Sequence, residues 1–255
     1  MAYFRKNQPL VVISAYFIVL LSVAVTTTYI LTRRYSDYEI RNYILAHPEI
    51  VVSAVTAYRG ALEDERETAR DQAVIRYFDG LTNDPLSPMA GNESGAKVVV
   101  EFFDYQCQYC KAVAPTIDEF VRSDAEAKII YKDFPILGDG SLLAARASLA
   151  AKQMGRFDDL HRAMLSAKGQ LDETRIKQLA EELQIPWQKL SATMQEPEID
   201  RELESNKKLA ETLGIKGTPA FIVGKKYVDF TIQSKEQIQD LLAAQRVTEN
   251  TRSRL

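Results

Sequence analysis

A short apolar run that leads directly into two closely spaced cysteines constrains this chain more than any other feature. Residues 98–111 read VVVEFFDYQCQYCK, so a strand-like run gives way within one turn to Cys107 and Cys110. A cysteine at such a junction faces the unpaired N–H groups of a helix N-terminus, which lower a thiol pKa from ~8.5 toward roughly 3.5 to 7.5. We therefore expect Cys107 to act as a nucleophile and Cys110, one turn deeper, to resolve the mixed disulfide.

The two cysteines are the only ones in the chain, and two other uses of the pair need to be weighed. A structural zinc ion needs four ligands, and neither His47 nor His161 stands at a ligand spacing from the pair. We predict no metal ion and no cofactor here, and a purely structural disulfide is the remaining alternative. The formal net charge of −3 gives no sign of a basic surface, so no nucleic-acid partner is expected.

A second signal lies far downstream, where GTPA at residues 217–220 precedes the apolar run 221–223. Pro219 stands at the very start of the expected strand, where its missing N–H costs no ladder hydrogen bond. Together with the cysteine pair, a proline at this position favours a redox function over zinc binding or a structural disulfide.

That combination resembles the DsbA-like branch of the thioredoxin superfamily. The similarity is carried by FFDYQCQYCK at 102–111, FPILG at 134–138 and GTPAF at 217–221. Upstream, YILAHPE at 43–49 and Gly91-Asn92 resemble more closely the ScsC type, the suppressor-of-copper-sensitivity thiol-disulfide oxidoreductases. The resemblance covers roughly residues 36–244.

The resemblance implies Cys107 as nucleophile, Cys110 as resolving thiol and Pro219 as a cis-proline facing them. Glu101 matches the buried acid of the DsbA-like pattern. A carboxylate on a buried strand is costly unless its pKa rises, and a raised pKa suits proton transfer with Cys110 near neutral pH. The alternative is that Glu101 lies at a strand edge and reaches solvent.

Thr218, Pro219, Gln108 and Tyr109 are the expected substrate-binding residues. Pro219 lacks an N–H, which leaves the Thr218 backbone free to pair with a substrate as an added strand; alternatively, Thr218 merely precedes a turn. Neither Gln108 nor Tyr109 is cationic, whereas the strongly oxidising DsbA motif has a histidine between its cysteines. We therefore expect a milder oxidant.

The N-terminus predicts export from the cytoplasm. Residues 7–32 contain no charged side chain, and residues 10–30 are long and apolar enough to span a bilayer. We assign residues 1–34 to a signal peptide or an uncleaved anchor, the alternative being a buried helix of a soluble protein. Together with the family resemblance, this layout places the rest of the chain in the periplasm.

Residues 35–80 are predicted to be helical and to drive oligomerisation. Ser36 and Asp37 can cap a first helix, and Pro48 can begin a second. The second carries an apolar stripe, which we call the N-terminal stripe and which consists of Val51, Val55, Tyr58 and Leu62. It packs either on the catalytic domain or on copies of itself; the ScsC resemblance favours a homo-oligomer such as a trimer.

The remaining sequence predicts an α/β domain of the DsbA-like thioredoxin fold over residues 97–244. Glycines and prolines mark residues 81–96 as a linker. The domain should consist of a strand–helix–strand unit with a kink at Pro115, a helical insertion at about 139–214, a hairpin of strands 220–223 and 226–230, and a helix capped by Ser234. The tail 245–255 is predicted to be disordered.

The predicted function is an extracytoplasmic thiol-disulfide oxidoreductase that forms or isomerises disulfides in exported proteins. Its partners would be proteins with thiols or disulfides and a membrane redox partner that resets the dithiol. A copper-binding protein and a chaperone-like assembly protein are the alternatives, and the second would use the N-terminal stripe in place of the thiols.

Overall fold

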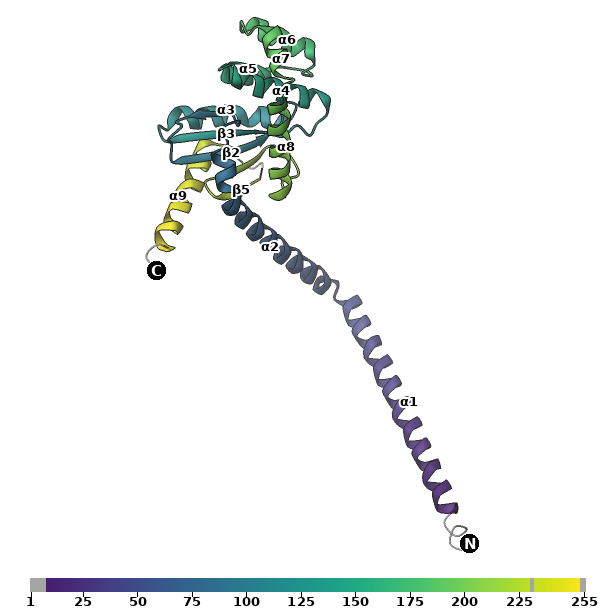
Figure 1. Ribbon diagram of the computed structural model, residues 1–255. Coiled ribbons are helices and arrows are strands. Elements are labelled where there is room, and N and C mark those ends of the chain that lie inside the picture. The colour runs from purple at the N-terminus through teal and green to yellow at the C-terminus, as the bar shows by residue number, and fades with distance from the viewer. Residues whose placement is uncertain (1–7, 230–231, 253–255) are drawn as a thin grey trace. The chain divides into compact units, whose positions relative to one another are not determined.

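A mixed sheet organises the part of the chain that contains both cysteines. The computed structural model describes residues 8–229 and 232–252. Within them the elements are α1 (Gln8–Ala46), α2 (Pro48–Thr82), β1 (Met89–Gly91), β2 (Lys97–Phe103), α3 (Gln108–Ser123), β3 (Ala127–Asp133), α4 (Asp139–Gln153), α5 (Phe157–Ser166), α6 (Glu173–Glu182), α7 (Trp187–Thr193), α8 (Pro197–Thr212), β4 (Ala220–Val223), β5 (Lys226–Val228) and α9 (Lys235–Arg252). The strand order is β1-β3-β2-β4-β5, with β2 and β3 parallel and the other pairs antiparallel (Figure 1). The predicted strand–helix–strand unit and hairpin are both present.

The chain divides into two units, Met1–Asp64 and Glu65–Leu255. In the first, α1 runs without a break to Ala46, so Ser36 and Asp37 do not cap a separate helix as predicted. No glycine or proline interrupts residues 10–46, and a capping side chain starts a helix only where the preceding backbone is not already helical. Pro48 does begin α2.

Part of α1 has the length and composition of a membrane span. Among the described residues, the helical stretch Ala15–Ala46 passes this test, because it contains an 18-residue window with a mean hydropathy of 1.8 and no buried residue. A cleaved signal sequence near the N-terminus would satisfy the same test, so the finding is compatible with either form of the predicted N-terminal segment.

Successive side chains of β2 point to opposite faces of the sheet and so belong to two different hydrophobic cores of the second unit. Val99, Glu101 and Phe103 point to one face of the sheet, and Val100 and Phe102 point to the other. The first face is covered by side chains from α3, α5 and α9, among them Ile117, Leu160 and Ile238. The second is covered by α8 and the C-terminal part of α2, through residues such as Ala210, Val74 and Leu81. Glu101 therefore lies on the same side as α3, which carries Cys110.

The C-terminal part of α2 belongs to the sheet unit and not to a separate oligomerisation region. Val74 and Leu81, seven residues apart and hence on one helical face, are both fully buried. Tyr227 of β5 donates its backbone N–H to the Asp71 carboxylate at 3.0 Å. Residues 65–80, predicted as part of the oligomerisation segment, are thus used to cover the sheet.

The predicted linker 81–96 contains an edge strand. Met89–Gly91 form β1, antiparallel to β3, with Met89 opposite Ile130. Gly91 has a φ of +89°, and a Cβ there would lie 2.4 Å from the carbonyl oxygen of Ala127. This glycine marks the close approach of two backbones at a sheet edge, which sequence composition alone cannot distinguish from a flexible link.

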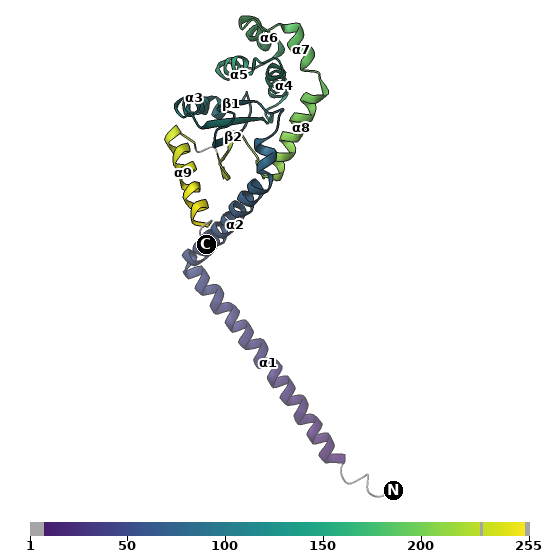
Figure 2. The same ribbon diagram turned by 60° about the vertical axis from the view of Figure 1, so that its left-hand side comes forward.

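The predicted insertion is helical throughout, from α4 to α8, and Figures 1 and 2 show α4 to α7 gathered beyond α3. Pro115 lies inside α3, and the predicted kink there stays a prediction. Ser234 accepts the backbone N–H of Gln237 at 3.3 Å, in agreement with its expected capping role. β5 ends at Val228, earlier than the predicted residue 230, which lies outside the described residues.

The tail prediction is wrong up to Arg252, because α9 continues through it. Gln245 explains part of this difference: its side chain accepts the Lys225 backbone N–H at 2.8 Å and donates to the Val223 carbonyl at 2.5 Å. A contact between the tail and the β4–β5 hairpin is a tertiary feature with no local sequence signal. Residues 253–255 lie outside the described residues.

Candidate active site

Cys107 is the residue at which strand geometry changes into helix geometry. It is the N-cap of α3, with an extended backbone (φ −72°, ψ 118°). Its N–H donates to the Asp104 carbonyl at 3.0 Å, and its own carbonyl accepts the first helical N–H, from Lys111, at 3.1 Å. The sulfur consequently lies at the N-terminus of a 16-residue helix, as the sequence predicts.

The surroundings of Cys107 favour its thiolate. Its pKa is lowered to about 5, first by a hydrogen bond from the Cys110 thiol and then, against the opposing effect of burial, by the Thr218 side chain and the N–H groups of Cys110 and Tyr109. In the thiol form its Sγ donates to the Thr218 carbonyl at 3.1 Å. A thiol with this pKa is largely ionised at neutral pH.

The surroundings of Cys110, by contrast, favour its protonated thiol. It is buried, and burial together with its hydrogen bond to Cys107 raises its pKa far above the ordinary value. The two sulfurs are one helical turn apart and reduced, so one is poised as a thiolate while the other keeps its proton. This asymmetry is what a nucleophile and a resolving thiol require.

Glu101 lies beneath the pair on a central strand, between Tyr131 of β3 and Phe221 of β4. It is buried, so the alternative of a strand-edge glutamate exposed to solvent does not hold. Burial, and secondarily the Cys107 charge, raises its pKa to about 8. It also lines a cavity of about 240 Å³, together with charged side chains such as Lys111 and Asp118.

The remaining predicted residues surround Cys107. The Thr218–Pro219 peptide bond is cis, and Pro219 is buried directly before β4. Gln108 and Tyr109 point outward on the first turn of α3, and Tyr109 is 73% exposed. The structure thus places Thr218 against the Cys107 sulfur, whereas Gln108 and Tyr109 lie on the exposed rim.

Two buried polar residues near the pair escaped the sequence interpretation. His161 lines the same cavity as Glu101, its Nδ1 is 2.8 Å from the Tyr105 hydroxyl, and burial lowers its pKa to about 3. It comes from α5, and no sequence spacing connects it to the cysteines. Asp104, three residues before Cys107, is also buried; an aspartate just ahead of a helix start is a capping signal that could have drawn attention to it.

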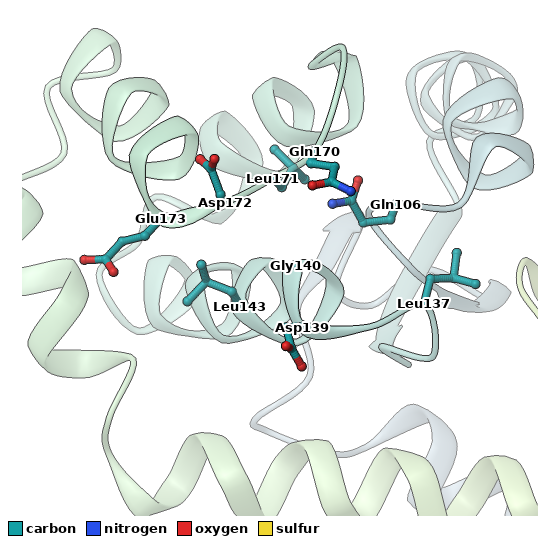
Figure 3. A pocket seen from close by; sticks show the side chains of 9 residues that line it. All are labelled: Gln106, Leu137, Asp139, Gly140, Leu143, Gln170, Leu171, Asp172 and Glu173. Atoms are coloured by element: carbon teal, nitrogen blue, oxygen red, sulfur yellow. The ribbon is translucent and has the colours of Figure 1, made fainter.

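A larger cavity, of about 660 Å³, opens beside the residue that precedes Cys107 (Figure 3). Gln106 and Leu137 line one side, and Asp172 and Glu173 contribute carboxylates from the start of α6. Across residues 8–229 and 232–252, no group of three or more His, Cys, Asp or Glu side chains could hold a metal ion.

Known proteins resemble this chain over the region that holds the site. The family described as "DSBA-like thioredoxin domain" matches residues 98–243. The thiol:disulfide interchange protein DsbA of Bordetella pertussis is 25% identical over 146 residues, covering 55% of this chain and 69% of that protein. Residues 98–243 include every predicted site residue.

Solved structures give the same result. A thioredoxin-like oxidoreductase from Silicibacter pomeroyi shares 37% identity with a TM-score of 0.63, over 66% of this chain and 96% of that one. ScsC of Proteus mirabilis in a transitional conformation shares 25% identity with a TM-score of 0.61, over 85% of this chain and 98% of that one. The second match covers more of the chain than the family domain alone.

Proposed function

On the premise that this chain belongs to the DSBA-like thioredoxin domain family, we propose that it forms or isomerises disulfides in exported proteins, outside the cytoplasm. Members of this family are extracytoplasmic thiol-disulfide oxidoreductases. The observation that carries the proposal is the placement of two free cysteines one turn apart at the start of α3, with Cys107 as the N-cap and its sulfur 3.1 Å from the Thr218 carbonyl. In this placement the pKa of Cys107 is lowered to about 5 and that of Cys110 is raised far above its ordinary value.

In the reductive direction, the Cys107 thiolate attacks one sulfur of a substrate disulfide. A Cys107–substrate disulfide forms, and the other substrate sulfur leaves as a thiolate that takes a proton from solvent. Cys110 then gives up its proton and attacks Cys107 Sγ, which releases the second substrate sulfur as a thiolate and leaves a Cys107–Cys110 disulfide. The substrate gains two electrons, the enzyme loses two, and the oxidative direction is the reverse sequence.

Glu101 is the proposed acceptor of the Cys110 proton. Its charge is among the influences that raise the pKa of Cys110, which supports a direct electrostatic interaction between the two groups. A carboxyl with a pKa of about 8 can take and release a proton near neutral pH, and the cavity that it lines connects it to charged side chains nearer the surface.

Thr218 and Pro219 are the proposed binding residues for the substrate backbone. The Thr218 carbonyl is 3.1 Å from the nucleophilic sulfur, so a peptide strand laid along residues 217–218 would bring its own cysteine to Cys107. Gln108 and Tyr109, exposed on the same rim, would contact the substrate on the other side of the sulfur.

The N-terminal unit supports two further parts of the proposal. The apolar stretch Ala15–Ala46 supports export or anchoring at the periplasmic side of a membrane, close to a membrane partner that resets the dithiol. Val51, Val55 and Tyr58 of the N-terminal stripe are exposed, which supports a homo-oligomer such as a trimer. Several Cys107 sites facing one substrate would favour repeated attack and therefore isomerisation.

Reactivation of a protein with scrambled disulfides tests the proposal. We expect the chain to restore activity to such a substrate, Cys107→Ser to abolish this, and Cys110→Ser to accumulate mixed disulfides that gel electrophoresis without reductant detects. Wild-type chain that neither reactivates the substrate nor changes its thiol content would overturn the proposed function.

A further inference from the structure

Asp104 is a buried charged side chain to which the exchange reaction assigns no role. It exposes 2% of its surface and stands between the end of β2 and Cys107. Burial of a carboxylate is costly unless hydrogen bonds replace the lost water, so its partners show what it is held there to do.

The carboxylate of Asp104 joins two loops. Its Oδ1 accepts the Gln106 backbone N–H at 2.7 Å, and its Oδ2 accepts the backbone N–H groups of Ile136 and Leu137 at 2.8 and 3.1 Å. Gln106 belongs to the turn that carries Cys107, whereas the other two belong to the 134–138 loop. Both loops line the larger cavity, through Gln106 and Leu137 (Figure 3).

The backbone of Asp104 contacts both cysteines. Its carbonyl accepts the Cys107 N–H at 3.0 Å, and its backbone is among the influences that act to lower the pKa of the Cys110 thiol. The residue that joins the two loops therefore also bonds the backbone of Cys107, and its main chain influences the Cys110 thiol.

We propose that Asp104 is a positioning residue for the dithiol: by binding the 134–138 loop, its carboxylate fixes the turn that holds Cys107 at the N-terminus of α3. The inference deepens the proposed function and rests on it. A carboxylate is required because it offers two acceptor oxygens and no donor. An asparagine at this position would keep one oxygen and turn an NH₂ group toward backbone donors.

Loss of the carboxylate should loosen the turn and displace Cys107 from its stabilising N–H groups. Asp104→Asn is expected to raise the pKa of Cys107 from about 5 toward the ordinary value of about 8.5. Attack on a disulfide at about pH 6 should slow at least tenfold, because the thiolate fraction falls with each unit of pKa. pH-dependent alkylation followed by mass spectrometry measures the pKa, and reaction with a chromogenic disulfide at the same pH measures the rate of attack.

Asp124→Asn is a matched control at the other end of α3. The Asp124 Oδ1 also accepts a backbone N–H two residues ahead, from Glu126 at 3.0 Å. The control variant should leave the Cys107 pKa unchanged even if its free energy of unfolding falls. A folded Asp104→Asn chain in which Cys107 titrates as in wild type would overturn the inference.

Amide hydrogen exchange in the wild-type chain provides a test that needs no variant. Ile136 and Leu137 are 41% and 53% exposed, so we expect their backbone N–H groups to exchange slowly only because Asp104 binds them. Fast exchange of both would overturn the inference. If Cys107 of the wild-type chain titrates at about 8.5, the proposed function fails; if it titrates near 5 and Asp104→Asn leaves it there, only the role of Asp104 fails.

Discussion

The two parts of α2 carry apolar side chains at similar helical spacing in opposite surroundings. In the N-terminal unit, Val51, Val55 and Tyr58 expose 44%, 43% and 66% of their surface, whereas Val74 and Leu81 in the sheet unit expose none. Helical spacing therefore identifies an apolar face but not its partner. In the second part the partner is the sheet face formed by residues such as Val100 and Phe102, and the first part shows no such cover among the described residues.

The two parts of α2 should also serve different functions, the second supporting thiol chemistry and the first supporting assembly. Each predicted site residue lies in the sheet unit, so isolated thiol chemistry should depend on the second part of α2 and not on the first. The proposed oligomer would depend on the first part alone. Substitutions in the two parts should consequently affect different measurements.

The largest expected effect is on stability. Leu81→Ala should lower the free energy of unfolding of the sheet unit by ~2–5 kcal/mol, because it removes fully buried methyl groups and leaves a cavity. Val55→Ala, at an exposed position, should change it by no more than about 0.5 kcal/mol. Denaturation followed by the fluorescence of Trp187, the single tryptophan, reports on the sheet unit. Equal losses in both variants would contradict the comparison.

The next effect concerns assembly. Replacing Val51 and Val55 together by serine should dissociate the proposed oligomer and reduce isomerase activity several-fold, while dithiol oxidation continues at the rate of wild type. Ile75→Ser is the control, since Ile75 is also an exposed residue of α2 (54%) but lies in the sheet unit. Light scattering at about micromolar concentration gives the oligomeric state; a monomeric wild-type chain would remove the proposal of an assembly.

A smaller effect is expected from Glu101, as a dependence of stability on pH. Between its ordinary pKa of 4.5 and its raised value of about 8, the unfolded chain has lost this proton while the folded chain keeps it. The contribution of Glu101 to the free energy of unfolding is therefore fully present below pH 4.5 and is lost as the pH rises toward 8. Glu101→Gln should remove this loss, which we place on the order of 1–3 kcal/mol.

Denaturation of wild-type and Glu101→Gln chains at the two ends of this pH range measures the difference. If Glu101 is also the proton acceptor, Cys110 of the variant should resolve the Cys107–substrate disulfide more slowly, while the Cys107 pKa stays nearly unchanged. A pH-independent difference in stability between the two chains would show that Glu101 does not titrate in this range.

Local patterns were sufficient to predict the site's framework. The strand–helix junction at Cys107, the position of Cys110 one turn later and the proline before β4 are each set by a few neighbouring residues. The bonds of Asp104 to Ile136 and Leu137 could not be predicted in this way, because they join segments more than 30 residues apart in the chain. The position of His161 from α5, in the cavity that Glu101 also lines, was missed for the same reason.

The same distinction explains the errors in the fold. The glycines of residues 81–96 indicated a linker, and only the pairing of β1 with β3 shows that one of them, Gly91, ends a strand. The tail beyond Gln245 has the polar composition of a disordered segment, yet Gln245 bonds to the hairpin. Ser36 resembles a helix start, but the helix that precedes it does not stop.

The smallest expected effect lies where α2 meets β5. Glu67 pairs with Lys226 at 3.0 Å, and both side chains are about half exposed. Glu67→Gln should therefore cost no more than about 1 kcal/mol, and less at high salt. Denaturation at low and high salt checks this value; a loss as large as that of Leu81→Ala would mean that the ion pair, and not the buried face of α2, fastens this helix to the sheet.

Ionisation of the two thiols in the reduced chain tests the central claim most directly. Alkylation across a range of pH, with each cysteine quantified by mass spectrometry, gives the pKa of both sulfurs in one experiment. The account predicts that Cys107 reacts with a midpoint at about 5 and that Cys110 stays unreacted at neutral pH. Equal reaction of both thiols at about pH 6, or a Cys107 midpoint near the ordinary value of about 8.5, would contradict it.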